Sequence, residues 1–481
     1  MKQKFYFRLF PFLCALLFFT LACVPTPETE FVVNKGDGVL QQGIMAEPVD
    51  AKLDLPAHIA LDAFEGVSTQ IVIDADVIVP DRERFPVVEI APQQIHADWA
   101  RRVMEWLADG YPLLQADTEV PDTKEEIAEE IRGLQDALSE WESEQRGKVS
   151  ETEWQEHEEE LREELADWQA AYLHAPDAIE GAPNLSTELF RKQGRLYASI
   201  DFGKRNPAAV EVLYNGDTSL YNFDDTIGLP NAYADVPDDA ILDGVSMTKA
   251  EAVQFALDRM EALGETGFEA VTVKAATHDP RDPSAGESEQ SWYVILTRAA
   301  DGVKTLHVNR QENLWKLNEN KDYIEPCEQE EVTFCLRDSG VNYFEWTAPA
   351  VQIRTVNEGT ALVPFETVLD TFRKLAALTP YRVIDETADA GTFTLTIDRI
   401  ELGMHRVRKR NDTHTFLMVP AWAFYGTVRI TDCDPSKTWL LHGWQFTPDA
   451  DGQGYSSCTP DACFMVINAI DGSRIDQSAG Y

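Results

Sequence analysis

The sequence predicts a fold of the α+β class. Stretches with the two-residue alternation of β-strands occur in groups, so their strands are expected to pair mainly antiparallel. Helical spacing is confined to a few segments, and the longest of these is a pair of heptad stripes in the first half of the 481-residue chain. The shares of hydrophobic residues, 44%, and of charged residues, 26%, are those of a globular protein.

The charge balance is strongly acidic. The chain has 83 Asp and Glu against 41 Lys and Arg, which gives a formal net charge of −42. A surface of this sign repels nucleic acids, so neither DNA nor RNA is expected as a partner. The sequence contains no P-loop, no GxGxxG before a helix, no GxSxG and no HExxH. It therefore assigns no cofactor, no metal and no catalytic residue.

Residues 1–22 have the layout of a secretory signal. Basic residues precede an apolar run that is shorter than a membrane-spanning helix. The stretch Thr20–Cys23 resembles a bacterial lipobox, although its leucine lies one position later than in the usual pattern. The resemblance implies that Cys23 becomes a lipidated N-terminus, followed by a tether over residues 23–60. Ordinary signal-peptide cleavage near Ala22 is the alternative.

A lipidated Cys23 places the protein outside the cytoplasm, attached to the cell membrane. No later segment of the sequence is apolar enough to span a bilayer, so the lipid would be the anchor. Val24 follows the expected lipid site. By resemblance to known sorting signals, this residue allows outer-membrane placement in a two-membrane cell, whereas in a one-membrane cell the protein would face outward.

The cysteines fit an exported protein, because an oxidising compartment permits disulfides. Of the seven cysteines, Cys14 leaves with the signal and Cys23 would carry lipid. The five that remain are Cys327, Cys335, Cys433, Cys458 and Cys463. A disulfide between Cys327 and Cys335 would close a short loop, and one further pair among the other three is plausible. Five buried free thiols are the alternative.

The first folded domain is expected at residues 61–240. Its strands and its first helix are predicted from alternation and from helical spacing. The strands are expected at 70–80, 85–90, 195–202 and 208–214, and the helix at 98–110.

Two heptad stripes are inserted in this domain. Apolar residues recur at alternating intervals of four and three over Ile127–Trp141, and at seven, four, three and four over Trp154–Tyr172. They predict an antiparallel helical hairpin over residues 123–173, with helices at 123–146 and 151–173. From position 122 to 172 the chain has 18 acidic and 5 basic residues. The hairpin either packs on its own domain or projects as an arm that binds a partner.

Two further units are expected, at residues 246–350 and 355–481. Each begins with an amphipathic helix, at 248–263 and at 365–378, and continues with strands. The repeated order predicts a duplicated module in which a curved antiparallel sheet wraps one helix. The strands are expected at 268–275, 291–298, 304–308 and 331–337, and at 392–407, 414–431 and 464–470.

One cluster departs from the acidic trend. Arg406, Arg408, Lys409 and Arg410 follow His405 at the junction of two predicted strands, which is the place of a hairpin tip. One interpretation is a solvated turn whose charge discourages edge pairing. The other is a docking patch for an anionic partner, such as a phosphate-bearing wall polymer or an acidic protein.

A motif near the C-terminus is assigned a structural role. Trp422 offers a large apolar face for packing. Pro420 suits a sheet edge or a bulge, because it has no backbone donor. Gly472 permits the positive φ of a turn that begins at Asp471, and Asn468 could bond a neighbouring backbone group.

The same residues carry a family resemblance. Leu417–Gly426 and Val466–Ser473, together with Val72–Pro80, resemble a family of uncharacterised bacterial lipoproteins, and the likeness spans most of the mature chain. The C-terminal pattern is also similar to PepSY and YycI-type extracytoplasmic modules. That resemblance implies two cystatin-like units with a peptidase-inhibiting or sensor-regulating role. It implies no catalytic residue.

Together these features predict a cell-envelope lipoprotein that binds or regulates an envelope partner without catalysis. Its expected contacts are the membrane, through the lipid anchor, and an envelope protein or wall polymer. Two alternatives stay open. One is an envelope hydrolase that acts through a carboxylate pair, and the other is a structural assembly component, for which stable oligomers are expected.

Overall fold

The computed structural model covers the whole chain and describes most of it. The described residues are 39–50, 53–66, 69–115, 124–141, 151–173, 185, 194–202, 208–213, 217–221, 232–278, 288–308, 327–379, 392–409, 412, 415–431, 446–448, 454–457 and 462–476.

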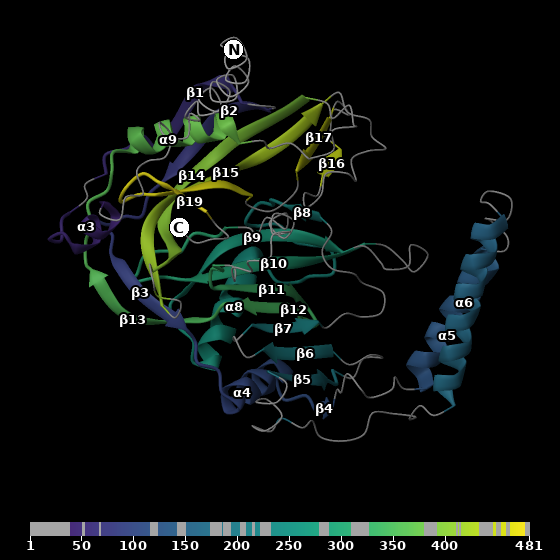
Figure 1. Cartoon of the computed structure of the whole chain (residues 1–481). Helices are drawn as coiled ribbons and strands as arrows, with labels where there is room; N and C mark the ends of the chain where they lie inside the picture. The colour runs from purple at the N-terminus through teal and green to yellow at the C-terminus, as the bar shows by residue number, and fades with distance from the viewer. Residues whose placement is uncertain are drawn as a thin grey trace, which may run out of the picture.

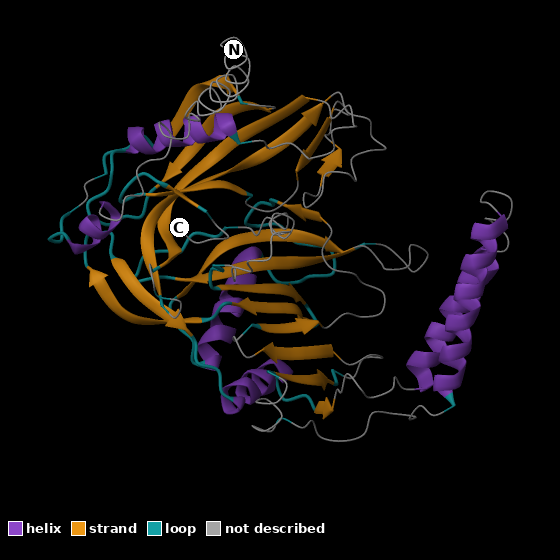
Figure 2. Cartoon of the chain, in the orientation of Figure 1, coloured by secondary structure: helices purple, strands orange, loops and turns teal. Residues whose placement is uncertain are grey.

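Two large sheets make up the body of the protein, and several of the helices pack on their faces, as expected for the α+β class (Figures 1 and 2). The helices are α3 (Val39–Met45), α4 (Ala97–Ala108), α5 (Lys124–Glu140), α6 (Glu151–Tyr172), α8 (Lys249–Leu263) and α9 (Phe365–Leu378). Sheet A contains β1 (His58–Glu65), β2 (Thr69–Ile78), β3 (Val87–Pro92), β13 (Ala350–Asn357), β14 (Thr392–Arg408), β15 (Phe416–Thr431), β16 (Phe446–Pro448), β17 (Gly454–Ser457), β18 (Cys463–Asn468) and β19 (Arg474–Ile475). Sheet B contains β4 (Leu113–Gln115), β5 (Arg195–Ile200), β6 (Ala208–Leu213), β7 (Thr218–Tyr221), β8 (Ala232–Ala234), β9 (Phe268–His278), β10 (Glu289–Arg298), β11 (Glu331–Arg337) and β12 (Gly340–Thr347).

Sheet B is antiparallel throughout and crosses the domain boundary predicted near residue 240. Its order is β4-β5-β6-β7-β12-β11-β10-β9-β8, so strands from both sides of the boundary share one sheet. The two groups of strands are connected by the antiparallel pairing of β7 with β12, in which Tyr221 lies opposite Tyr343. The predicted separation of 61–240 from 246–350 is therefore wrong. Periodicity identifies strands, but it does not say which strands hydrogen-bond to one another.

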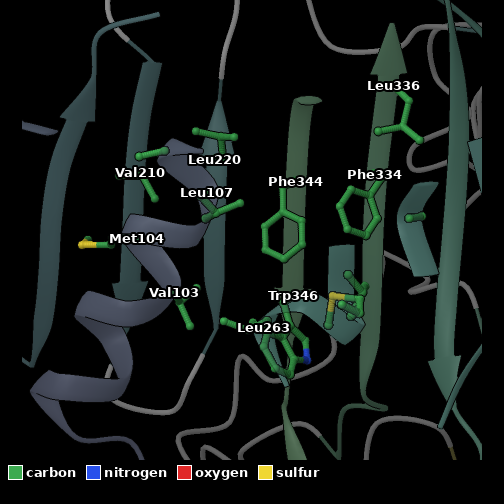
Figure 3. Close-up of a cluster of buried hydrophobic side chains, with 14 of the residues drawn as sticks. Val103, Met104, Leu107, Val210, Leu220, Leu263, Phe334, Leu336, Phe344 and Trp346 are labelled. Carbon is green, nitrogen blue, oxygen red and sulfur yellow. The ribbon is translucent and has the colours of Figure 1, made fainter. Parts of the chain in front are cut away.

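One core holds these strands together beneath α4 and α8. Val103, Met104 and Leu107 of α4 lie over Val210 and Leu220, and the core continues to Phe344 and Trp346 of β12 (Figure 3). The start of α8 is fixed by a capping box, in which the Thr248 side chain accepts from the Glu251 amide.

Sheet A combines strands from the N-terminal and the C-terminal parts of the chain. β2 pairs in parallel with β14, with Ile73 opposite Ile397, and β3 pairs with both β13 and β15. The predicted separation of 61–240 from 355–481 is therefore also wrong. The alternating residues of β2 face α9 across a core in which the rings of Phe372 and Phe424 stack 4.1 Å apart.

The hairpin of β14 and β15 is long and curved (Figure 1). Near its middle the register shifts between Ile397 and Arg399. A side chain on Gly426 would lie only 2.0 Å from the Thr396 carbonyl oxygen, so this close approach requires glycine. Beyond the shift both faces of the hairpin are buried. The segment predicted as a strand at 304–308 forms only an isolated bridge, from Thr305 to Met404.

The C-terminal motif lies within this hairpin and the strand beside it. Trp422 is 1% exposed, and its ring lies 4.7 Å from that of Phe365 in α9. Pro420 lies where the outer neighbour of β15 changes from β3 to β18, a position that needs no donor. The Asn468 side chain accepts from the Ile470 amide at 2.8 Å, and Gly472 has a φ of 74°. The Asp471 carboxylate accepts from Ser473.

The stretch predicted as a tether over residues 23–60 is bound to the body from α3 onward. Ile44 is buried among residues of sheet A. The Asn357 side chain donates to the carbonyl oxygens of Ile44 and Ala46, both at 3.0 Å. The lipid site Cys23 lies outside the described residues. In the part of the chain that the structure describes, no helix has both the length and the apolar character needed to cross a bilayer.

We expect Trp422→Ala to lower the free energy of unfolding by about 3–5 kcal/mol, because it empties a fully buried site against α9. Urea denaturation followed by fluorescence measures the change. Leu378→Ala is the matched control, since Leu378 is 54% exposed at the end of the same helix. Equal losses in the two variants would show that Trp422 does not hold α9 on the sheet.

Candidate functional site

Of the residues predicted to form the docking patch, Arg406 lies inside the molecule, whereas Arg408 and Lys409 are half-buried. Arg406 is 5% exposed, its guanidinium lies 3.7 Å from the centroid of the Phe416 ring, and it donates to the Glu328 carbonyl oxygen at 2.8 Å. Burial lowers the pKa of the Arg406 guanidinium. The Arg408 guanidinium lies 5.8 Å from the centroid of the same Phe416 ring. Arg410 lies outside the described residues.

The charge of the patch is also balanced by acids. The Lys409 amine lies 2.5 Å from one carboxylate oxygen of Glu89 and 3.3 Å from Asp412. The other Glu89 oxygen accepts from Arg354 at 2.6 Å. The Lys409 amine, followed by Arg354, lowers the pKa of the Glu89 carboxyl. The hypothesis of an exposed cationic docking patch is therefore wrong for Arg406 and Lys409, because Glu328 and Glu89, which are far away in the sequence, bind them.

The Glu89 network leads instead to β13, whose first half forms an exposed sheet edge. We call Val351, Gln352, Ile353 and Arg354 the edge patch. All four side chains are exposed, and Val351 and Ile353 are 42% and 50% exposed. Among the described strands, β13 pairs only with β3. Its other edge therefore presents backbone donors and acceptors beside two apolar side chains.

The edge patch follows the point where the chain passes from sheet B to sheet A. Ala348 has a φ of 46°, and its amide donates to the Asp217 carboxylate at 2.7 Å. The Pro349 carbonyl oxygen then accepts from Gln93, which sets the pairing of β13 with β3. The far end of β13 is covered by α3 through Asn357. Only the first half of the strand is thus left open.

An open edge of this kind can accept an added strand from another polypeptide. The sequence-based elements missed β13 altogether. The alternation of Val351, Ile353 and Thr355 with polar residues is a strand signal that could have revealed it. The alternation could not have shown that β13 lies at a sheet edge, because its pairing partner β3 lies more than two hundred residues earlier in the sequence.

The buried carboxylates are bound to structural partners. Glu330 is 8% exposed, and burial raises the pKa of its carboxyl. Such a group is a candidate general acid. However, Arg298 lies 2.9 Å from one of its oxygens, and Trp346 donates to the other at 3.2 Å. Arg298 also binds Glu265 at 2.9 Å, so this carboxylate pair shares one guanidinium and gives the hydrolase alternative no support.

A second buried pair lies close to this one. His307 bonds Glu331 at 2.7 Å, and the Tyr425 hydroxyl of sheet A donates to the His307 carbonyl oxygen at 2.7 Å. These contacts tie the two sheets together. Among the described residues, no group of three or more His, Cys, Asp or Glu could hold a metal ion.

The described cysteines have buried side chains, and they are Cys327, Cys335 and Cys463. Cys327 and Cys335 form no disulfide with each other. The predicted disulfide between Cys327 and Cys335 is therefore wrong. Cys335 lies within β11, where burial raises the pKa of its thiol to about 12, and Cys327 lies in an apolar cluster with Met404. Cys433 and Cys458 lie outside the described residues.

Comparisons with known proteins add little to this geometry. The sequence matches no protein-family model and no curated protein. The structure is similar to that of an uncharacterised protein from Eubacterium rectale ATCC 33656, with a TM-score of 0.45 and 11% sequence identity. The alignment covers 92% of this chain and 99% of the other.

The buried His405 should make the stability of the protein depend on pH. Its side chain is 2% exposed, its Nδ1 atom has no hydrogen-bond partner among the described residues, and burial lowers the pKa of the imidazole to about 3, from an ordinary value of 6.5. Between these two values the unfolded chain binds a proton at this position and the folded chain does not. The free energy of unfolding should therefore fall as the pH is lowered through this window.

In His405→Gln this component is removed, so the loss of stability between pH 6.5 and pH 4.5 should be smaller than in the wild type. Urea denaturation at several pH values measures it. His58→Gln is the matched control of opposite sign, because hydrogen bonds to Asp76 and Asp74 raise the pKa of the exposed His58. Identical pH profiles for the wild type and His405→Gln would contradict the buried, uncharged state of His405.

Proposed function

We propose that the protein is a cell-envelope lipoprotein that binds or regulates an envelope partner without catalysis, and that the edge patch is its binding surface. The observation that carries this proposal is the first half of β13, whose outer edge is unpaired among the described strands and lies beside Val351 and Ile353. Natural sheets usually protect such edges with lysine, proline or a covering segment. Here α3 covers the far end of the strand, and no described strand pairs with the edge patch on its outer side.

An extended segment of a partner protein fits this edge better than a wall polymer does. Main-chain hydrogen bonds would supply affinity, and contacts with alternate side chains would supply specificity. Val351 and Ile353 offer apolar contacts to such a segment. Arg354 offers a cation that Glu89 already holds in position at 2.6 Å.

The order of elements supports the proposal that the chain contains two cystatin-like, PepSY-type units. In the first, α8 precedes four antiparallel strands, β9 to β12. In the second, α9 precedes the curved hairpin of β14 and β15 and the shorter β18. We propose in addition that α5 and α6 form an antiparallel hairpin inserted between β4 and β5. The Trp141 indole, which donates to the Trp154 carbonyl oxygen at 3.4 Å, supports this arrangement.

The edge patch can be tested by affinity capture from envelope extract, with residues 24–481 as bait. Ile353→Lys should reduce the recovery of the partner at least tenfold, because it places a charge at the open edge. Ile241→Lys is the matched control, since Ile241 is also an exposed isoleucine, at 78%, but belongs to the segment between β8 and α8. Partner recovery that falls equally in both variants, or in neither, would contradict the edge patch as the binding surface.

The anchor can be tested separately through Cys23. In a bacterial host, Cys23→Ser should move the protein from the membrane fraction to the extracytoplasmic soluble fraction, because no lipid can be attached. It should also abolish metabolic labelling with a clickable fatty acid. Cys14→Ser, which alters the apolar run of the signal, is the control and should stay membrane-bound. Unchanged membrane association of Cys23→Ser would contradict the lipid anchor.

A further inference from the structure

Helices α5 and α6 lie apart from both sheets, as Figure 1 shows. We call this helix pair the arm. Within the described part of the chain, the substantial contacts of each helix are with the other. The described part of the body therefore does not cover the apolar stripe that a helix normally buries against a core.

The two helices bury only part of their own stripe. Ile127, Leu138 and Trp154 are buried, at 1%, 8% and 8% exposed. Tyr172 is 37% exposed. The remaining apolar stripe positions keep intermediate exposure, and they are Ile131, Leu134, Trp141, Leu161, Leu165 and Trp168. Two helices have too little facing surface to enclose such a stripe, whereas four helices enclose it completely. A second pair of helices would therefore be needed to complete a four-helix bundle around the stripe of the arm.

Charge in the arm is segregated by heptad position. With the stripe at positions a and d, the outward positions b, c and f of α5 and α6 carry 11 acidic residues and 1 basic residue. The positions a, d, e and g carry only 4 acidic and 2 basic residues. Two of these, Glu158 and Arg162, pair with each other at 2.7 Å. The side of the arm that holds the stripe is therefore close to neutral.

The residues that flank the stripe are small or uncharged at most places. Alanine or glutamine occupies positions e and g at 128, 135, 137, 155, 169 and 171. A partner helix that binds through charge would require acidic residues at these flanks, since e and g positions set the pairing of helices. Neutral, small flanks instead allow an identical surface to approach, while the acidic faces stay on the outside.

We propose that the arms of two copies of this protein pack stripe to stripe into a four-helix bundle, which makes the protein a dimer. The same surface would be used on both subunits, as two-fold symmetry requires. The bundle would bury the exposed leucines and tryptophans of both arms. It would keep the two acidic faces on opposite sides, where salt screens their repulsion. This inference is independent of the edge patch.

The test is the oligomeric state of residues 24–481, measured by sedimentation velocity between 1 and 100 µM in 0.15 M and 1 M NaCl. We expect a dimer whose dissociation constant falls at high salt. Leu134→Glu with Leu165→Glu should raise that constant at least tenfold. Because these changes also touch the contact between α5 and α6, Ala128→Arg and Ala137→Arg provide flank variants that leave the stripe intact. At least one of the two should raise the constant tenfold with unchanged helical circular dichroism.

Two controls separate this interface from other surfaces. Glu163→Lys, at an outward position of α6, should leave the dimer intact, and so should Ile353→Lys in the edge patch. A monomer at 100 µM in both salts would overturn the proposal. A dimer that weakens at high salt, or that survives all stripe and flank variants, would also overturn it, because its contacts would then lie elsewhere.

Discussion

The structure depends on the hairpin of β14 and β15, to which strands from both ends of the chain attach. β2 pairs in parallel with β14, and β3 and β18 pair with the far side of β15. Beyond the register shift near Ile397, the hairpin is buried on both faces. One face of the hairpin therefore packs on the α9 core, and the other packs on the segments that lead to sheet B. The polar contacts of His307 and Lys409 lie along the same hairpin.

The sequence predicted local elements well and long-range pairing poorly. The helices at α4, α8 and α9 and the long strands β2, β14 and β15 lie close to their predicted ranges, because their periodicity is strong. The domain boundaries were wrong, since they follow the pairing of β7 with β12 and of β2 with β14, which no local pattern records. The same limit applies to the site. Arg406 has the sequence context of a solvated turn, but residues from other parts of the chain bury it. The edge patch is exposed because no described strand pairs with the outer edge of β13.

The two proposed surfaces have different chemistry and lie on different elements. The edge patch offers backbone groups and two apolar side chains on a rigid sheet. The arm offers an apolar stripe on helices that carry their charge on the outer face. A lipoprotein that dimerises through the arm would present two edge patches at one membrane. Binding to a partner that carries two sites would then gain from effective concentration, without any stronger single contact.

The parallel pairing of β2 with β14 has a consequence for how the chain reaches its folded state. Ile73 and Ile397 lie opposite each other although more than three hundred residues separate them in the sequence. Contacts of such long range slow folding, because the chain entropy is lost before the contact forms. If the protein is exported as proposed, the N-terminal strands would emerge first and stay unpaired until the C-terminal hairpin follows, with the apolar face of β2 open to solvent. Under that proposal, chaperones would have to protect these strands until the C-terminal hairpin has crossed the membrane.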